Sequence, residues 1–168
     1  EEWKSRRVLL HFEAVDYSCR VFVNEKLCTE HTGGNAGFCA DITDYLRDGE
    51  QTLAVAVYDP AQDETIPRGK QFWQEESADI WYTRTTGIWQ SVWLEQVPAS
   101  RLEEVWFETD YDARQVTAHI RATAKKEIPS LCMRVFCEEK ELTSQSIALG
   151  LSNSSDHPQT YTASLTFT

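Results

Sequence analysis

The side chains best suited to binding or chemistry lie in one stretch in the middle of the chain. They are Arg68, Lys70, Gln71, Trp73, Trp81 and Tyr82. Five of the six tryptophans fall between Trp73 and Trp106. Indole and phenol rings offer stacking faces, and guanidinium, ammonium and amide groups donate hydrogen bonds to hydroxyls and carboxylates. This combination predicts a surface that contacts either a sugar or a partner domain.

Three interpretations of these six residues remain open. The residues can dock on another domain, contact a sugar directly, or pack within the chain itself. The connection that carries them starts after Tyr58 and runs to about Ile80 with little apolar periodicity. Loops of this length are commonly functional, and binding sites favour domain junctions, so the first two interpretations can coincide.

Other residues that often carry catalysis are better explained by structure. Glu75 and Glu76 are adjacent, and adjacent strand residues point to opposite faces. His11 and His119 lie in alternating segments without a partner that suggests a triad. We expect His31 to be a structural histidine and Gly33-Gly34 to form a tight turn with positive φ. The sequence therefore predicts no catalytic residue and no metal site.

Composition limits the class of partner. The chain has 168 residues, of which 41% are apolar and 26% are charged, as is usual for a globular protein. The net charge of -11 opposes binding to nucleic acid or to an anionic membrane. No segment approaches the roughly 18 apolar residues of a membrane span.

The cysteines argue against a disulfide framework. They are Cys19, Cys28, Cys39, Cys132 and Cys137. Their number is odd and none forms a Cys-x-x-Cys pair, so neither a disulfide scaffold nor a zinc site is indicated. We expect buried thiols, no cofactor, and a reducing compartment, with the cytoplasm favoured.

The readable segments of the first half have a period of two, which predicts β-strands. Val8–Phe12 and Arg20–Val23 alternate, and Asn24–Lys26 is a plausible hairpin turn. Residues 53–57 form another strand. Residues 88–95 carry bulky side chains on both faces, which favours a central strand. The only helical signal is a single turn that Asp41 is placed to cap.

A domain boundary is predicted at Gln96–Ser100, where Pro98 follows a strong strand and tryptophan becomes scarce. Strands resume beyond it, around Val105, Val116–Ala122, Leu131–Cys137 and Tyr161–Phe167. Alternating strands with no helices between them are typical of an immunoglobulin-like sandwich.

Four stretches together are similar to a known series of motifs. Val8–Tyr17 resembles a strand leading into a V-D-Y turn, and Arg20–Lys26 resembles a V-x-V-N-G hairpin with Glu25 in place of glycine. Glu30–Thr43 resembles H-x-G-G-(x)-F-x-x-D-I-T, and Gly87–Leu94 resembles G-I-W-x-x-V-x-L. Each is weak alone, but their order and spacing resemble the sugar-binding domain of glycoside hydrolase family 2.

The resemblance implies an all-β chain with two domains. Residues 1–97 are expected to form a jelly-roll, galactose-binding-like β-sandwich that lacks its first strands. Residues 98–168 are expected to form an immunoglobulin-like β-sandwich that is incomplete. In retaining enzymes of the β-galactosidase and β-glucuronidase type, two carboxylates about 5–5.5 Å apart perform hydrolysis. The resemblance places both in a later barrel domain, and no acidic residue here matches either one.

The function expected from this resemblance is non-catalytic. The chain would be a fragment of a retaining β-glycosidase that braces the barrel and shapes one rim of the substrate pocket. The alternatives are a free-standing carbohydrate-binding module and a structural or adhesion β-sandwich. Expected partners are the catalytic barrel of the parent chain, a carbohydrate, and further copies of the chain through exposed strand edges.

Overall fold

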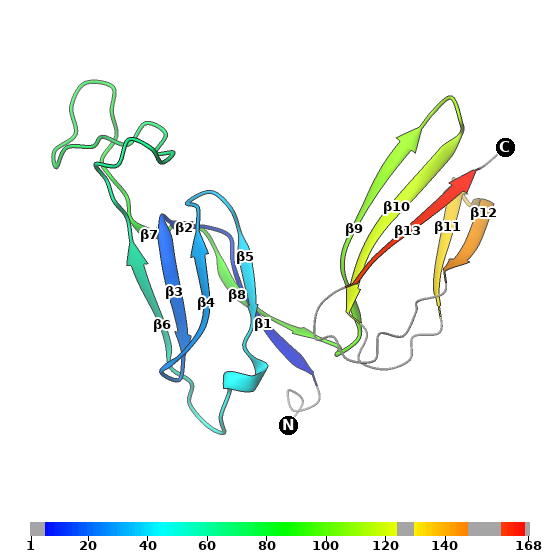
Figure 1. The fold of residues 1–168 in the computed structure, drawn as a ribbon, viewed down its shortest axis with the longest axis horizontal. Helices are drawn as coiled ribbons and strands as arrows, with labels where there is room; N and C mark the ends of the chain where they lie inside the picture. Colours follow the sequence, from blue (N-terminus) through cyan, green and yellow to red (C-terminus); the bar gives the residue numbers. More distant parts are fainter. Residues whose placement is uncertain (1–5, 124–129, 148–158, 167–168) are drawn as a thin grey trace. The chain divides into compact units, whose positions relative to one another are not determined.

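A computed structural model describes residues 6–123, 130–147 and 159–166. The chain forms two compact units, Glu1–Val97 and Pro98–Thr168 (Figure 1). Within the described ranges, every regular element except one short 3-10 turn is a β-strand. The prediction of an all-β chain is confirmed. The same ranges contain no helix with the length and apolar character that a membrane crossing requires.

The first unit is built from two three-stranded antiparallel sheets that form two layers (Figure 1). One sheet has the order β5 (Phe38–Asp41), β1 (Arg7–Phe12) and β8 (Val92–Val97). The other has the order β4 (Lys26–Thr32), β3 (Ser18–Val23) and β6 (Leu53–Tyr58). A short pair joins β2 (Val15–Asp16) to β7 (Gly87–Ile88).

The core of this unit comes from the alternating faces of β1 and β3. Val8, Leu10 and Phe12 of β1 pack in one cluster with Val21 and Val23 of β3. Each of the five is at most 2% exposed. Full burial of such a side chain contributes roughly 1.5–3 kcal/mol of transfer free energy. The face predicted for residues 8, 10 and 12 is therefore confirmed.

The expectation of one central strand over residues 88–95 is wrong. The segment is divided between β7 and β8, and among the described residues β8 pairs with β1 alone, at the edge of its sheet. The large side chains on the outer face of β8 pack against a neighbouring residue of β1. The Trp93 ring stacks on His11 at a centroid distance of 4.7 Å, and the His11 Nε2 lies 2.9 Å from the Glu95 Oε2.

The β3–β4 hairpin turns through two residues that both have positive φ. Asn24 has φ 49° and Glu25 has φ 69°, as a type I′ turn requires. The Asn24 side chain also donates to the Tyr45 carbonyl at 2.9 Å and accepts from the Thr52 N–H at 3.0 Å. These bonds fix the turn although Glu25 occupies the position where glycine is preferred.

The predicted helical turn is a 3-10 turn, η2 (Thr43–Tyr45). Asp41 lies two residues before it, and its Oδ1 accepts from the Thr43 N–H at 3.0 Å. Its Oδ2 accepts from the Arg7 Nε at 2.8 Å. Burial raises the pKa of Asp41, but the hydrogen bonds from Arg7 and Thr43 outweigh it, so the pKa falls below its ordinary value. This carboxylate ties η2 to β1.

The second unit has two sheets in the described ranges. One has the order β13 (Gln159–Thr166), β10 (Gln115–Thr123) and β9 (Arg101–Asp110), and the other pairs β11 (Leu131–Cys137) with β12 (Lys140–Ile147). Ala118, Ile120 and Ala122 of the central strand form its core. The predicted strand end at Phe167 lies outside the described residues.

β12 has no counterpart in the sequence-based prediction. Its two apolar residues, Leu142 and Ile147, stand five positions apart and on opposite faces, so no alternation is visible. The other sheet of this unit repeats a contact seen in the first unit. The Trp106 ring of β9 stacks on the His119 ring of β10 at a centroid distance of 5.0 Å, as Trp93 stacks on His11. The His119 Nε2 lies 3.2 Å from the Glu108 Oε2.

The cysteine prediction is partly wrong. None of the five forms a disulfide, but only Cys19 is buried, Cys28 is half-buried, and Cys39, Cys132 and Cys137 are exposed. Cys39 and Cys132 lie on the outward faces of β5 and β11, where alternation places every second residue in solvent, and Cys137 is the last residue of β11. Burial raises the pKa of the Cys19 and Cys28 thiols.

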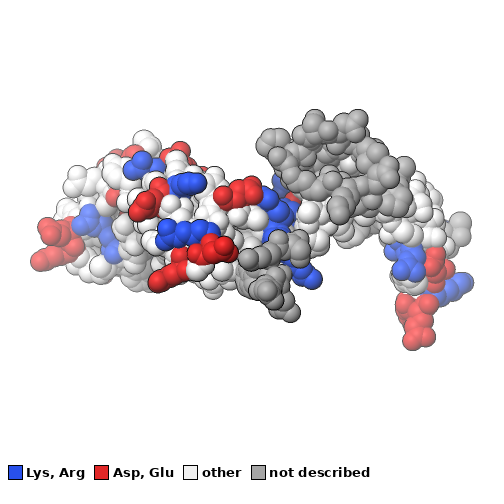
Figure 2. Space-filling view, turned by 90° about the horizontal axis from the view of Figure 1, so that it is seen from below, with Lys and Arg blue, Asp and Glu red and all other residues white. Residues whose placement is uncertain are grey.

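Charged side chains of both signs are mixed on the surface. In the view of Figure 2, Lys and Arg lie among Asp and Glu across the described part of the face shown, and no basic stripe forms there.

Replacing Glu25 with glycine is expected to raise the free energy of unfolding by about 0.5 kcal/mol, because glycine adopts positive φ without a Cβ clash. Glu25→Ala is the matched control, since it removes the same side chain but keeps the Cβ. Urea unfolding of both variants measures the difference. Equal stability of the glycine and alanine variants would contradict the turn assignment.

Candidate functional site

The candidate site is the long connection between β6 and β7, residues 59–86, which extends beyond the ends of the strands of the first unit (Figure 1). It contains no strand of its own but has internal order. The Phe72 N–H donates to the Tyr82 carbonyl and the Tyr82 N–H donates to the Lys70 carbonyl, both at 2.9 Å. These two bonds bring its halves together beside the Gln71–Tyr82 bridge.

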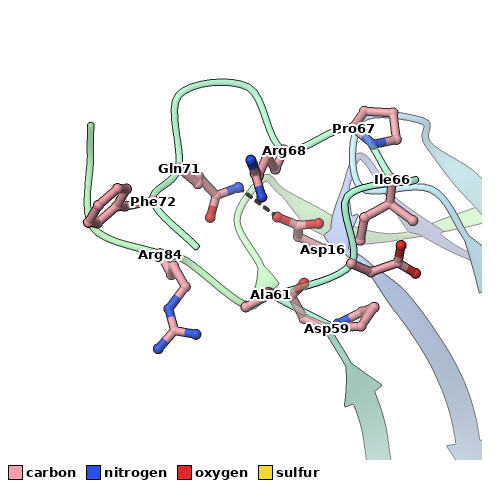
Figure 3. A pocket seen from close by; sticks show the side chains of 11 residues that line it. Asp16, Asp59, Ala61, Ile66, Pro67, Arg68, Gln71, Phe72 and Arg84 are labelled. Atoms are coloured by element: carbon pink, nitrogen blue, oxygen red, sulfur yellow. Dashed lines mark hydrogen bonds between the residues drawn. The ribbon is translucent and has the colours of Figure 1, made fainter. Parts of the chain in front are cut away.

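A side-chain clamp fixes the connection to the sandwich. The Gln71 Nε2 donates to the Asp16 Oδ2 at 3.0 Å (Figure 3). The Gln71 Oε1 accepts from the Thr85 N–H at 2.7 Å and lies 3.1 Å from the Thr85 hydroxyl. One amide therefore joins β2, the middle of the connection and the residue two positions before β7.

A second contact closes the base of the connection. The Thr86 hydroxyl donates to the Asp59 Oδ2 at 2.6 Å, which links the residue after β6 to the residue before β7. Both ends of the segment are thus held near each other, as in compact surface loops whose ends are close.

Gly34 makes room for the clamp. A Cβ at this position would clash with the Asp16 carboxylate. The Gly34 carbonyl also accepts from the Trp89 Nε1 at 2.7 Å. Gly33 has φ 127°, as predicted for the turn, whereas Gly34 is required by close approach. His31 stacks on Phe38 at 4.3 Å and its Nε2 donates to the Gly33 carbonyl at 3.1 Å, as expected of a structural histidine.

Three of the six residues singled out in the sequence pack inside the connection. The ring centres of Trp73 and Trp81 lie 5.6 Å apart in an edge-to-face arrangement. Both rings contact the ring of Phe72, a residue that is 8% exposed. The Arg68 guanidinium lies 4.9 Å from the centre of the Trp73 ring. These rings form a small apolar centre for a segment that otherwise has none.

The other three residues divide between support and surface. Gln71 belongs to the clamp. Lys70 and Tyr82 project outward. Tyr82 is 66% exposed, and the Lys70 Nζ lies 6.0 Å from the centre of the Tyr82 ring. Lys70 and Tyr82 are therefore the two of the six whose polar groups are available to a ligand or a partner domain.

A cavity lies between the connection and β2. Its lining includes Asp16, Asp59, Arg68, Gln71 and Arg84 (Figure 3). Its volume is about 20 Å³, enough for a water molecule but not for a sugar ring. The Arg68 Nη1 is buried there without a hydrogen-bond partner. A water in this cavity would satisfy it, so the cavity is a structural feature of the connection.

The described residues contain no group of three or more His, Cys, Asp or Glu side chains able to hold a metal ion. The Asp63 pKa is lowered by hydrogen bonds from Thr65, which keeps this carboxylate in its charged form. A charged, solvent-facing carboxylate of this kind stabilises a loop turn and does not mark a general acid.

Asp16, Phe72 and Thr85 were not predicted to act at this site. Asp16 stands within the V-D-Y motif, but its partner Gln71 is 55 positions away, and no local pattern connects them. Phe72 was overlooked because it lies between the more prominent Gln71 and Trp73.

The architecture defines the class of protein as a β-sandwich module with an ordered surface connection. The chain belongs to glycosyl hydrolase family 2: its residues 1–98 match the model of the family's sugar binding domain. The resemblance noted from the sequence motifs is confirmed.

Relatives agree with this assignment. The chain is 35% identical over 147 residues to a β-galactosidase of Clostridium acetobutylicum, covering 84% of this chain and 15% of the relative. It is 33% identical over 112 residues to a β-galactosidase of Thermoanaerobacter pseudethanolicus, covering 66% and 14%. The chain therefore spans about a seventh of the length of these relatives.

Solved structures share the fold. A Bacteroides uniformis β-glucuronidase matches with a TM-score of 0.64 and 21% identity, covering 99% of this chain and 20% of that one. A glycosyl hydrolase family 2 member from Bacteroides cellulosilyticus matches with a TM-score of 0.61 and 19% identity, covering 97% and 21%.

Replacing Gln71 with alanine is expected to speed amide hydrogen exchange at Thr85 about tenfold or more, because loss of a bond to a charged partner costs about 1.5–3 kcal/mol. Exchange in β1 and β3 should not change. Gln74→Ala is the matched control, since Gln74 is an exposed glutamine in the same connection. Unchanged exchange at Thr85 in the Gln71 variant would contradict the clamp.

Proposed function

We propose that this chain is the non-catalytic part of a retaining β-glycosidase that hydrolyses terminal β-linked sugars. The match of residues 1–98 to the sugar binding domain supports the proposal, and so do relatives named β-galactosidase. The two catalytic carboxyl groups, an acid/base and a nucleophile, belong to another part of the polypeptide. The role of this part is to brace the catalytic barrel and to shape one rim of the substrate pocket.

The ordered connection is the observation that carries this role. The clamp through Asp16 and Gln71 and the packed rings of Trp73 and Trp81 hold its backbone in place. Lys70 and Tyr82 are then presented outward from a fixed support. A preorganised ammonium and phenol can contact the barrel or a substrate hydroxyl without a large loss of conformational entropy.

The second unit is proposed to be an immunoglobulin-like domain. Its two sheets pack around Ala118 and Ile120, and the space between them has a volume of about 600 Å³. Phe107 of β9 lines this space and is 60% exposed. Apolar side chains left open at a sheet edge favour contact with further protein, in keeping with a bracing role.

Lys70→Ala and Tyr82→Ala are expected to lower kcat/KM about tenfold in the longer polypeptide that carries this chain, a loss of roughly 1.4 kcal/mol of transition-state binding. Lys140→Ala, an exposed lysine of the second unit, should leave kcat/KM unchanged. The measurement uses chromogenic β-galactoside and β-glucuronide. If the Lys70 and Tyr82 variants keep the kcat/KM of the parent, the proposed role at the rim of the substrate pocket is refuted.

The chain by itself serves as the reference in that experiment. It should release no chromophore from either substrate. Turnover that copurifies with it through successive columns would overturn the non-catalytic assignment.

We also propose that the isolated chain self-associates through the edge of β6. Within the part of the chain that the structure describes, this strand pairs with β3 alone, and its sequence, Leu53–Tyr58, contains no charged residue and no proline. Leu53 of its inner face is 48% exposed. Uncharged, unpaired edges are templates for pairing with another copy.

Sedimentation should show an average mass that rises with concentration, and Ala54→Lys on the outer face of β6 should suppress the rise, because a lysine on an edge strand opposes pairing. Lys substitution of Thr109 on β9 provides a matched control in the second unit. A monomer at all concentrations would refute association through β6.

A further inference from the structure

The outer face of the β4–β3–β6 sheet has a hollow separate from the connection described above. Its volume is about 310 Å³. Six side chains surround it in two rows across the three strands, in register: Thr32, Ser18 and Tyr58, then Glu30, Arg20 and Ala56. Alternation places Cys19 and Val21 of the same strand in the core, so these rows face away from it.

Small residues create the depression. Ser18 and Ala56 form its floor, between the larger side chains of Tyr58 and Arg20. The Ser18 hydroxyl donates to the Tyr58 carbonyl at 3.1 Å, which fixes the floor to β6. Three paired strands provide a rigid base, and sites on strands hold their geometry better than sites on loops.

The rim combines the groups that sugars require. Tyr58 is 67% exposed and offers an aromatic face at one side. Arg20 of the central strand lines the hollow and carries five N–H donors, and its guanidinium lies 5.9 Å from the centre of the neighbouring Phe22 ring. Glu30, directly opposite Arg20 in register, supplies acceptors. Donors and acceptors on neighbouring strands suit the hydroxyl groups of a sugar ring.

We propose that this hollow is a binding site for a neutral pyranose. Its volume is at the lower end of the range for ligand pockets, roughly 300 Å³, which suits one ring, whereas the cavity beside Gln71 admits only water. Glu30 and the net charge of -11 disfavour a uronate or a phosphate. The proposal rests on the carbohydrate-processing role proposed above and adds a contact for a sugar unit.

The test is an NMR titration of the isotope-labelled chain with methyl β-galactoside, and with glucuronate as the charged comparator. Amide shifts should concentrate in residues 18–20, 30–32 and 56–58, with a Kd near 10 mM, or roughly 2.7 kcal/mol of binding free energy. Tyr58→Ala and Arg20→Gln should each weaken binding at least fivefold. Glucuronate should bind more weakly than the galactoside.

Leu27→Ala is the control, because Leu27 is 45% exposed beside Phe22 on the same sheet but does not line the hollow. It should bind as the parent does. Near-native spectra of each variant establish that folding is retained, and Arg20→Lys provides a second replacement if Arg20→Gln is unstable.

The proposal is overturned if the galactoside produces no shifts at 50 mM, about five times the expected Kd. It is also overturned if the shifts fall only in residues 59–86 or if Tyr58→Ala binds normally. These outcomes are independent of the turnover assay. Hydrolysis by the isolated chain would defeat the proposed function without affecting the hollow, and loss of binding here would leave the rim role intact.

Discussion

The carboxylate of Asp16 is the contact on which the geometry of the 59–86 connection depends. It accepts a hydrogen bond from Gln71, and it occupies the space that a side chain at position 34 would need. Gln71 in turn uses its amide oxygen for Thr85. Because both ends of one amide are engaged, a change at Asp16 also disturbs the entry to β7. A segment without regular secondary structure thus acquires a fixed position from one hydrogen-bond network that is only partly buried.

The aromatic residues of this segment serve two different purposes. Trp73 and Trp81 pack on Phe72 and on each other, so their surfaces stabilise the connection. Tyr58 and Tyr82 are more than half exposed and lie at positions suited to contact. Aromatic density in a sequence therefore does not by itself identify a binding surface. Here the more polar tyrosines face outward, whereas the indoles provide the local core.

Alternation was sufficient to predict β1, β3 and β6 of the first unit, because each has one face toward the core and one toward solvent. It failed at residues 88–95, where Trp93 packs on His11 across the outer face and imitates a buried residue. It also missed β12, whose apolar residues do not share a face. The six residues of the candidate site were found from composition, but their division into clamp, packed rings and exposed groups depends on contacts with distant positions such as Asp16, which no local pattern records.

The stacked tryptophan–histidine pairs give each unit its own optical marker. His11 lies against Trp93 in the first unit and His119 lies against Trp106 in the second, with nearly parallel rings in both. The emission of an indole depends on the ring that stacks against it. Replacing His11 would therefore change the emission of Trp93, and replacing His119 would change that of Trp106, so the difference between each variant and the parent reports on one unit.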